Sequence, residues 1–92
     1  MVMSNKTHVN VTLDFRNLGE LEYDLRIPIH QPVKQLLMNV IQTLRLQISQ
    51  SFPYVVKVPT KQLLLADDDK LSEYKVTDGD RLVVLSKGST EE

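Results

Sequence analysis

The acidic run Asp67-Asp68-Asp69 is the part of the chain whose residue types most suggest chemistry, because closely spaced carboxylates can hold a calcium ion. A calcium-binding loop that began at Asp67 would need glycine at its sixth position and glutamate at its twelfth. The chain has Ser72 and Asp78 there. We therefore expect the run to be a solvated turn, and we predict no metal site.

Other residues that could support catalysis are few. Cysteine is absent, and neither histidine, His8 or His30, has a useful ligand at helical spacing. The three glycines, Gly19, Gly79 and Gly88, stand apart, so they form no glycine-rich phosphate loop. No serine lies in a nucleophile motif. The sequence therefore predicts a protein with no catalytic residues and no cofactor.

The composition of the chain limits the kinds of partner that we expect. The 92 residues include 11 Lys plus Arg against 12 Asp plus Glu, a near-balance that gives no electrostatic reason to expect nucleic acid or anionic lipid. The aromatic residues do not interleave with a basic cluster. The longest apolar runs are only four residues, whereas a membrane span needs roughly twenty. We expect a cytoplasmic protein that binds no nucleic acid and does not insert directly into a membrane.

Two stretches of alternating apolar and polar residues begin the folded region. Residues 9–15 and 21–27 each place an apolar side chain at every second position, which is typical of a strand with one buried face. The turn residues 17–20 separate them, so the pair is predicted to be an antiparallel hairpin. Phe15, Tyr23 and Tyr54 fall at alternating strand positions and are expected in the core.

One amphipathic helix is expected next, of about three to four turns. Residues 33–44 place apolar side chains at i, i+3, i+4 and i+7. Pro32 suits the first helical turn, where its missing N–H is not needed, whereas Gln31 is a weak N-cap. Where the helix ends is left open, because Ser49, Ser51 and Pro53 favour an irregular return segment.

Three further strands complete the predicted elements, at 54–58, 63–65 and 81–85. Leu71 and Tyr74 are expected to anchor the loop before the last strand. Asp78-Gly79 is predicted to form a turn, because glycine tolerates the positive φ that such turns need. The order is strand-strand-helix-strand-strand-strand.

This order carries a resemblance to a known family. Residues 71–85 are similar to the end of ubiquitin-like domains, with a Leu-Ser-acid-Tyr turn, an Asp-Gly turn and a closing apolar strand. A sharper pattern comprises Val-x-Val-Thr-Leu-Asp-Phe at 9–15, Tyr-Asp-Leu at 23–25, Pro-Val-Lys at 32–34 and Leu-Ser-x-x-x-Val-Thr-Asp-Gly-Asp-Arg-Leu at 71–82. The pattern resembles the YukD/EsaB family of small bacterial ubiquitin-like proteins associated with type VII secretion.

The resemblance implies an α+β fold of the ubiquitin-like β-grasp type. In this fold a mixed five-stranded sheet packs on one helix, and the first and last strands are parallel neighbours at the sheet centre. We expect this domain to span residues 8–85, between flexible tails at 1–7 and 86–92.

The resemblance also implies a role as an accessory or regulatory component of a Gram-positive type VII (ESX-like) secretion system. The implied partners are proteins of the machinery, either a membrane ATPase or a membrane-anchored subunit, which would hold the protein at the inner face of the membrane. Two hypotheses stay open, a stably bound subunit and a soluble regulator. The sequence does not fix the oligomeric state.

The alternative function is a ubiquitin-like modifier or sulfur carrier, activated at its C-terminus. Activating enzymes thread a terminal Gly-Gly through a narrow channel. Here Gly88 is a single glycine, Lys87 precedes it, and four more residues follow it to Glu92. The tail therefore favours a protein that is not conjugated.

A partner site is expected on the sheet face turned away from the helix. Leu82 and Val84 are expected to face the helix, so that Val83 and Leu85 face outward beside the first and third strands. Exposed apolar side chains at a sheet centre often serve a partner, although two ordinary exposed residues are the alternative. The candidate partner-binding residues are Thr12, Lys57, Val83 and Leu85.

Overall fold

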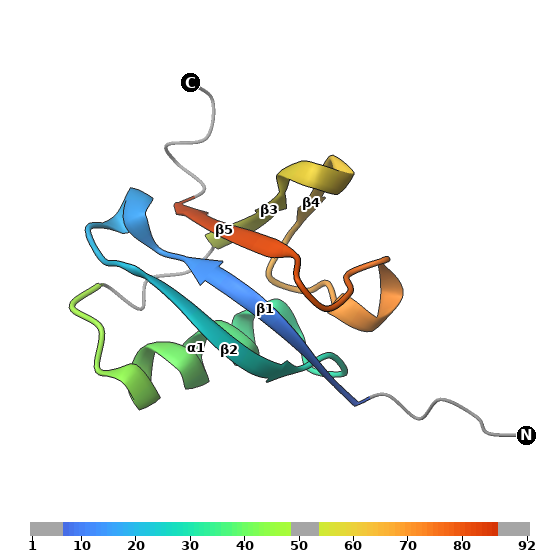
Figure 1. Ribbon diagram of the computed structural model, residues 1–92. Coiled ribbons are helices and arrows are strands. Elements are labelled where there is room, and N and C mark those ends of the chain that lie inside the picture. The colour runs from blue at the N-terminus through green and yellow to red at the C-terminus, as the bar shows by residue number, and fades with distance from the viewer. Residues whose placement is uncertain (1–6, 49–53, 87–92) are drawn as a thin grey trace, which may run out of the picture.

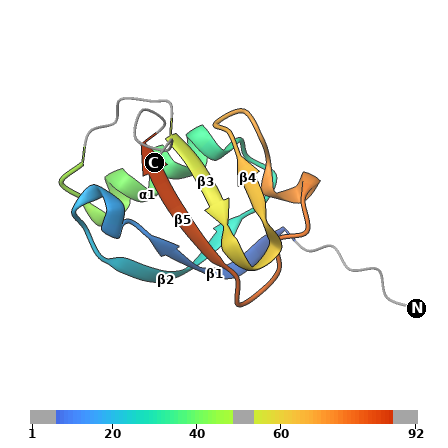
Figure 2. The same ribbon diagram turned by 90° about the horizontal axis from the view of Figure 1, so that it is seen from above.

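The computed structural model describes residues 7–48 and 54–86, and the architecture below refers to these residues. One helix lies across one face of a five-stranded sheet (Figures 1 and 2). The elements are β1 (His8–Asp14), β2 (Glu22–Pro28), α1 (Val33–Leu44), β3 (Tyr54–Val58), β4 (Leu63–Leu65) and β5 (Arg81–Ser86). The predictions made for residues 1–6, 49–53 and 87–92 lie outside the described residues.

The sheet has the strand order β2-β1-β5-β3-β4. β1 and β5 are parallel neighbours at its centre, and the other pairs are antiparallel. This arrangement confirms the predicted mixed sheet and the predicted meeting of the first and last strands. The two edge strands are β2 and β4.

Alternation along the strands builds the core. The apolar residues of β1 and β5 that face α1 are buried, and so is the apolar stripe of the helix. Phe15 is fully buried and meets the ring of Tyr23 edge to face, with 6.2 Å between ring centroids. These contacts confirm the predicted helical stripe and the predicted core position of Phe15.

The helix begins one residue later than the weak Gln31 cap would imply. Pro32 occupies the N-cap position, and its side chain cannot accept a hydrogen bond. The loop after β4 supplies the acceptors instead: the N–H groups of Val33 and Lys34 donate to the carbonyls of Asp69 and Asp67, at 2.8 and 2.9 Å. The acidic run is thus a turn, as predicted, and its backbone caps the helix.

The Asp78-Gly79 turn sets β5 beside β1. Gly79 has φ +91°, a conformation that a side chain disfavours. Its N–H donates to the carbonyl of Asn10 at 2.8 Å, and the N–H of Asn10 donates to Asp78 Oδ1 at 2.8 Å. The N–H of Thr12 then donates to the carbonyl of Asp80 at 3.0 Å. The turn therefore fixes the register of two strands that lie far apart in the sequence.

A buried carboxylate holds the same loop. Lys61 Nζ lies 2.9 Å from Asp80 Oδ2 and donates to Thr77 Oγ1 at 2.8 Å, while the N–H of Thr77 donates to Asp80 Oδ2 at 2.8 Å. Burial raises the pKa of Asp80, but the bonds from Lys61 and Thr77 outweigh it and lower that pKa. Asp80 is therefore a structural anchor.

Candidate functional site

An apolar row crosses the outer face of the sheet, on the side away from α1. Val83 and Leu85 alternate with the buried Leu82 and Val84 and are only half-buried. Lys57 of β3 lies directly opposite Val83, as expected from the sequence. The outward direction of these three side chains follows from strand alternation alone.

Thr12 lies elsewhere on this face. Its partner on β5 is Arg81, whereas the β1 residue opposite Val83 is Asp14. The Thr12 hydroxyl donates to Asp24 Oδ1 at 2.6 Å. The candidate Thr12 therefore does not flank Val83. It lies two residues along β1 from the position opposite Val83, because the Asp78-Gly79 turn, and not the apolar pattern, sets the parallel register.

Leu64 is the residue that the sequence analysis missed. It lies on β4 opposite Lys57, and 62% of its surface is exposed. Alternation within the strand could have indicated it, since the middle residue of 63–65 must point away from its neighbours. Residues of this region line one shallow hollow, which includes Lys57, Leu64 and Leu85. We call Lys57, Leu64, Val83 and Leu85 the apolar outer patch.

The other half of the same face is charged. Asp14 is only 3% exposed although it points outward, because arginine side chains cover it. Arg16 donates to it three times, from N–H at 2.9 Å, Nε at 3.0 Å and Nη2 at 2.8 Å, and Arg81 Nη1 lies 3.0 Å from its Oδ2. Arg81 also pairs with Glu22. We call Asp14, Arg16, Glu22 and Arg81 the charged outer cluster.

The electrostatics of this cluster are those of a structural network. The side-chain hydrogen bonds from Arg16 lower the pKa of Asp14 to about 2, against the opposing effect of burial. The same carboxylate raises the pKa of Arg16. All the charges are paired with one another, so the cluster holds the end of β1 to β5 and offers no unpaired acid or base.

Metal and membrane sites have little support in the part of the chain that the structure describes. Residues 7–48 and 54–86 contain no group of three His, Cys, Asp or Glu side chains that could hold a metal ion. The Asp69 carboxylate accepts a hydrogen bond from the Ala66 N–H at 2.8 Å, which is turn chemistry. Within the same ranges, none of the helices has the length and apolar character needed to cross a membrane.

Comparison with solved structures defines the class of protein. The ubiquitin of Caldiarchaeum subterraneum superimposes with a TM-score of 0.62 at 19% identity, covering 87% of this chain and 94% of its own. The ubiquitin-like domain of the Mycobacterium tuberculosis type VII secretion system protein ECCD1 gives a TM-score of 0.58 at 18% identity, covering 88% and 100%. The protein has the ubiquitin-like β-grasp fold, as the α+β prediction expected.

Sequence comparison then gives the family. The family model described as "WXG100 protein secretion system (Wss), protein YukD" matches residues 8–84. The type VII secretion system accessory factor EsaB of Staphylococcus aureus is 40% identical over 78 residues, covering 85% of this chain and 96% of its own. The ESX secretion system protein YukD of Bacillus subtilis is 26% identical over 78 residues, covering 85% and 99%. The chain belongs to the YukD family, which confirms the resemblance found in the sequence.

Proposed function

We propose that this protein is a non-enzymatic accessory component of a type VII secretion system and that it acts by protein–protein contact at the apolar outer patch. Family membership and the names of the EsaB and YukD relatives support the secretion role. The observation that carries the contact site is the division of the outer face. The charged side chains of the charged outer cluster are paired with one another, whereas Leu64, Val83 and Leu85 are not packed against the described core.

The chemistry of the patch suggests its partner. Lys57 stands at the centre of an apolar row and makes no ion pair with another described residue. A partner surface with apolar side chains around one acidic group would match it. We propose a membrane ATPase or a membrane-anchored subunit of the machinery as that partner, with the protein on the cytoplasmic side of the membrane. Thr12 lies outside the apolar outer patch, beside Arg81 and Asp24, and is not expected to contribute to binding.

Substitution of the patch tests the proposal. Val83→Glu and Leu85→Glu are expected to abolish binding to the machinery and export of its WXG100 substrate, with little effect on the fold because both side chains point away from the core. The assay is complementation of a deletion strain, with thermal unfolding of each purified variant. Leu21→Glu is the matched control, because Leu21 is 66% exposed and lies outside the patch. If both patch variants bind and secrete normally, the patch is not the site.

Cell fractionation with crosslinked pull-down separates the two modes of action. Co-purification with the secretion ATPase or its membrane partners supports a stably bound subunit. A purely soluble pool without such contact supports a regulator that acts on gene expression or on assembly.

Intact mass addresses the alternative of a modifier or sulfur carrier. The tail residues on which that alternative depends, 87–92, lie outside the described structure. We expect protein isolated from its native cell to carry an unprocessed, unmodified C-terminus. A truncated tail or a higher-mass adduct would contradict the proposal.

A further inference from the structure

Within residues 7–48 and 54–86, the edge strand β2 pairs only with β1 and leaves half of its backbone groups without a partner. At the two ends of this hairpin, the N–H of Ile29 donates to the carbonyl of Thr7 at 3.0 Å and the N–H of Phe15 donates to the carbonyl of Leu21 at 3.1 Å. Since hydrogen-bonded pairs alternate along an antiparallel ladder, these bonds direct the odd-numbered residues of β2 toward β1. The backbone groups of its even-numbered residues therefore face the free edge.

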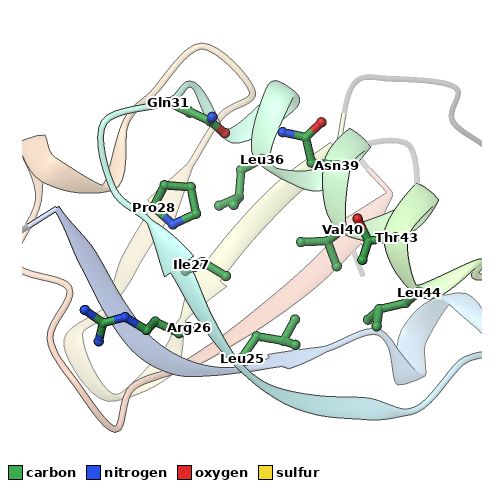
Figure 3. A pocket seen from close by; sticks show the side chains of 10 residues that line it. All are labelled: Leu25, Arg26, Ile27, Pro28, Gln31, Leu36, Asn39, Val40, Thr43 and Leu44. Carbon is green, nitrogen blue, oxygen red and sulfur yellow. The ribbon is translucent and has the colours of Figure 1, made fainter.

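An apolar groove of about 200 Å³ lies beside this edge, between β2 and α1 (Figure 3). Aliphatic side chains from the two elements point toward one another across it, whereas Arg26 points away from the helix. The apolar lining residues are Leu25, Ile27, Pro28, Leu36, Val40 and Leu44. The groove is therefore separate from the apolar outer patch, which lies on the opposite face and toward the opposite edge of the sheet.

Gln31 adds an unpaired acceptor to the groove. The residue lines the groove, and its Oε1 atom is buried without a hydrogen-bond partner among the described residues. A buried acceptor without a donor destabilises the free protein. A ligand that brought a donor to this atom would remove that penalty.

We propose that this edge and groove bind an extended segment of a partner protein, which adds a sixth strand beside β2. The unpaired N–H and C=O groups of Asp24 and Arg26 repeat at the spacing that another strand matches. Every second side chain of the added strand would then enter the groove, where aliphatic residues fit its lining. A donor on that strand would reach Gln31.

Charge on the outer face defines the segment further. The side chains of the added strand that do not enter the groove lie beside Asp24 and Arg26. The Asp24 carboxylate already accepts the Thr12 hydroxyl, whereas Arg26 is exposed and makes no ion pair with another described residue. Opposite charges across neighbouring strands stabilise the pair. The expected ligand therefore alternates aliphatic and polar residues and places an acidic residue opposite Arg26.

The first test uses a synthetic peptide, Thr-Val-Glu-Ile-Thr-Val-Thr with blocked ends, and its Glu-to-Lys counterpart. Titration into the full ¹⁵N-labelled chain should shift the amides of Asp24 and Arg26 most, and saturating peptide should slow their hydrogen exchange about tenfold. The Lys peptide should bind several-fold more weakly. Shifts confined to the apolar outer patch, or equal binding of both peptides, would overturn the proposal.

Two substitutions at one position isolate the backbone contribution. Asp24→Pro and Asp24→Ala both lose the bond with Thr12, but only proline also removes the N–H at the free edge, a position where a sheet tolerates proline. The Pro variant should bind the peptide about tenfold more weakly than the Ala variant. Equal binding would exclude strand addition.

Gln31→Leu provides a second readout if Asp24→Pro fails to fold. Removing the unpaired acceptor should raise the melting temperature of the free chain by about 4 °C while weakening the peptide complex. A variant that is less stable, or that binds the peptide more tightly, would contradict the role given to Gln31.

A second copy of this chain is the competing occupant. Antiparallel pairing of two β2 strands would place Asp24 of one chain against Arg26 of the other. Light scattering of the peptide-free protein should show a monomer. A dimer that Asp24→Pro dissociates would overturn the proposal in favour of self-association.

Discussion

The two halves of the outer sheet face differ in what their side chains already do. In the charged outer cluster, Asp14 receives four donors and is almost fully buried beneath the arginines that serve it. In the apolar outer patch, Lys57 and Leu64 are exposed. Among the described residues, Leu64 does not pack against the core and Lys57 makes no ion pair. β5 lies between β1 and β3 (Figure 2) and contributes to both halves, because its Arg81 pairs with β1 and its Val83 pairs with Lys57 of β3.

The difference shows that charge alone is a poor guide to a partner site. The ion pairs of the charged outer cluster stabilise the β1–β5 junction, so their charges are neutralised within the fold. The exposed apolar residues of the apolar outer patch add little to the stability of the fold. A partner that covered them would bury apolar surface, so this half is where we expect a partner to bind. Variants of the charged outer cluster should therefore change the stability of the fold, whereas variants of the apolar outer patch should change partner binding.

The largest expected effect on stability is that of Asp14→Ala. The substitution removes the acceptor of four hydrogen bonds and leaves the cluster without its centre, which should lower the free energy of unfolding by about 3 kcal/mol. Urea unfolding measures it, and partner binding should be unchanged under conditions where the variant is folded. A loss below about 1 kcal/mol would mean that the cluster is not a structural network.

The next effect is a dependence of stability on pH. The pKa of Asp14 is about 2 in the folded chain, below its ordinary value of 3.8, so its contribution is complete above about pH 5 and is lost as the pH falls from there toward 2. The loss should be about 2 kcal/mol. Asp14→Asn should flatten this part of the profile, whereas an unchanged slope would assign the acid sensitivity to other groups, among them Asp80.

A smaller effect is expected at Thr12. Thr12→Val removes the hydroxyl that donates to Asp24 and should destabilise the chain by about 1 kcal/mol. Thr12→Ser, which keeps a hydroxyl, is the matched control. If Thr12→Val instead left stability unchanged and weakened partner binding, Thr12 would belong to the partner site and not to the structural half.

The smallest effect on stability is expected in the apolar outer patch. Leu64→Gln should change the free energy of unfolding by less than about 0.5 kcal/mol, because the side chain is mostly exposed. It should nevertheless weaken partner binding in the pull-down, as Val83→Glu does. Normal binding by Leu64→Gln would confine the site to β3 and β5.

Much of the fold could be predicted from the sequence, because the strands and the helix are each indicated by residues that are close together in the chain. Period-two alternation predicted the hairpin, and the apolar stripe from Val33 to Leu44 predicted the helix, whose end the sequence left open and the structure places at Leu44. Alternation also gave the outward direction of Lys57 and Val83. The central parallel pair came from the family resemblance, since no local pattern pairs strands that far apart.

The features that were missed depend on contacts between distant segments. The register of Thr12 against Arg81 is set by the turn at Gly79, which bonds to Asn10. The groove beside β2 forms where that strand meets α1, and in the sequence each of its aliphatic lining residues has the pattern of an ordinary core position. The carbonyls that cap the helix likewise come from a loop more than thirty residues away.

Crosslinking in living cells tests the central claim most directly. A photoreactive residue at position 83 should capture a membrane ATPase or a membrane-anchored subunit of the secretion machinery, and the same residue at Asp68, an exposed position in the turn after β4, should not. Capture of the same partner from Asp68 alone, or the absence of any such partner from position 83 in secreting cells, would contradict the account.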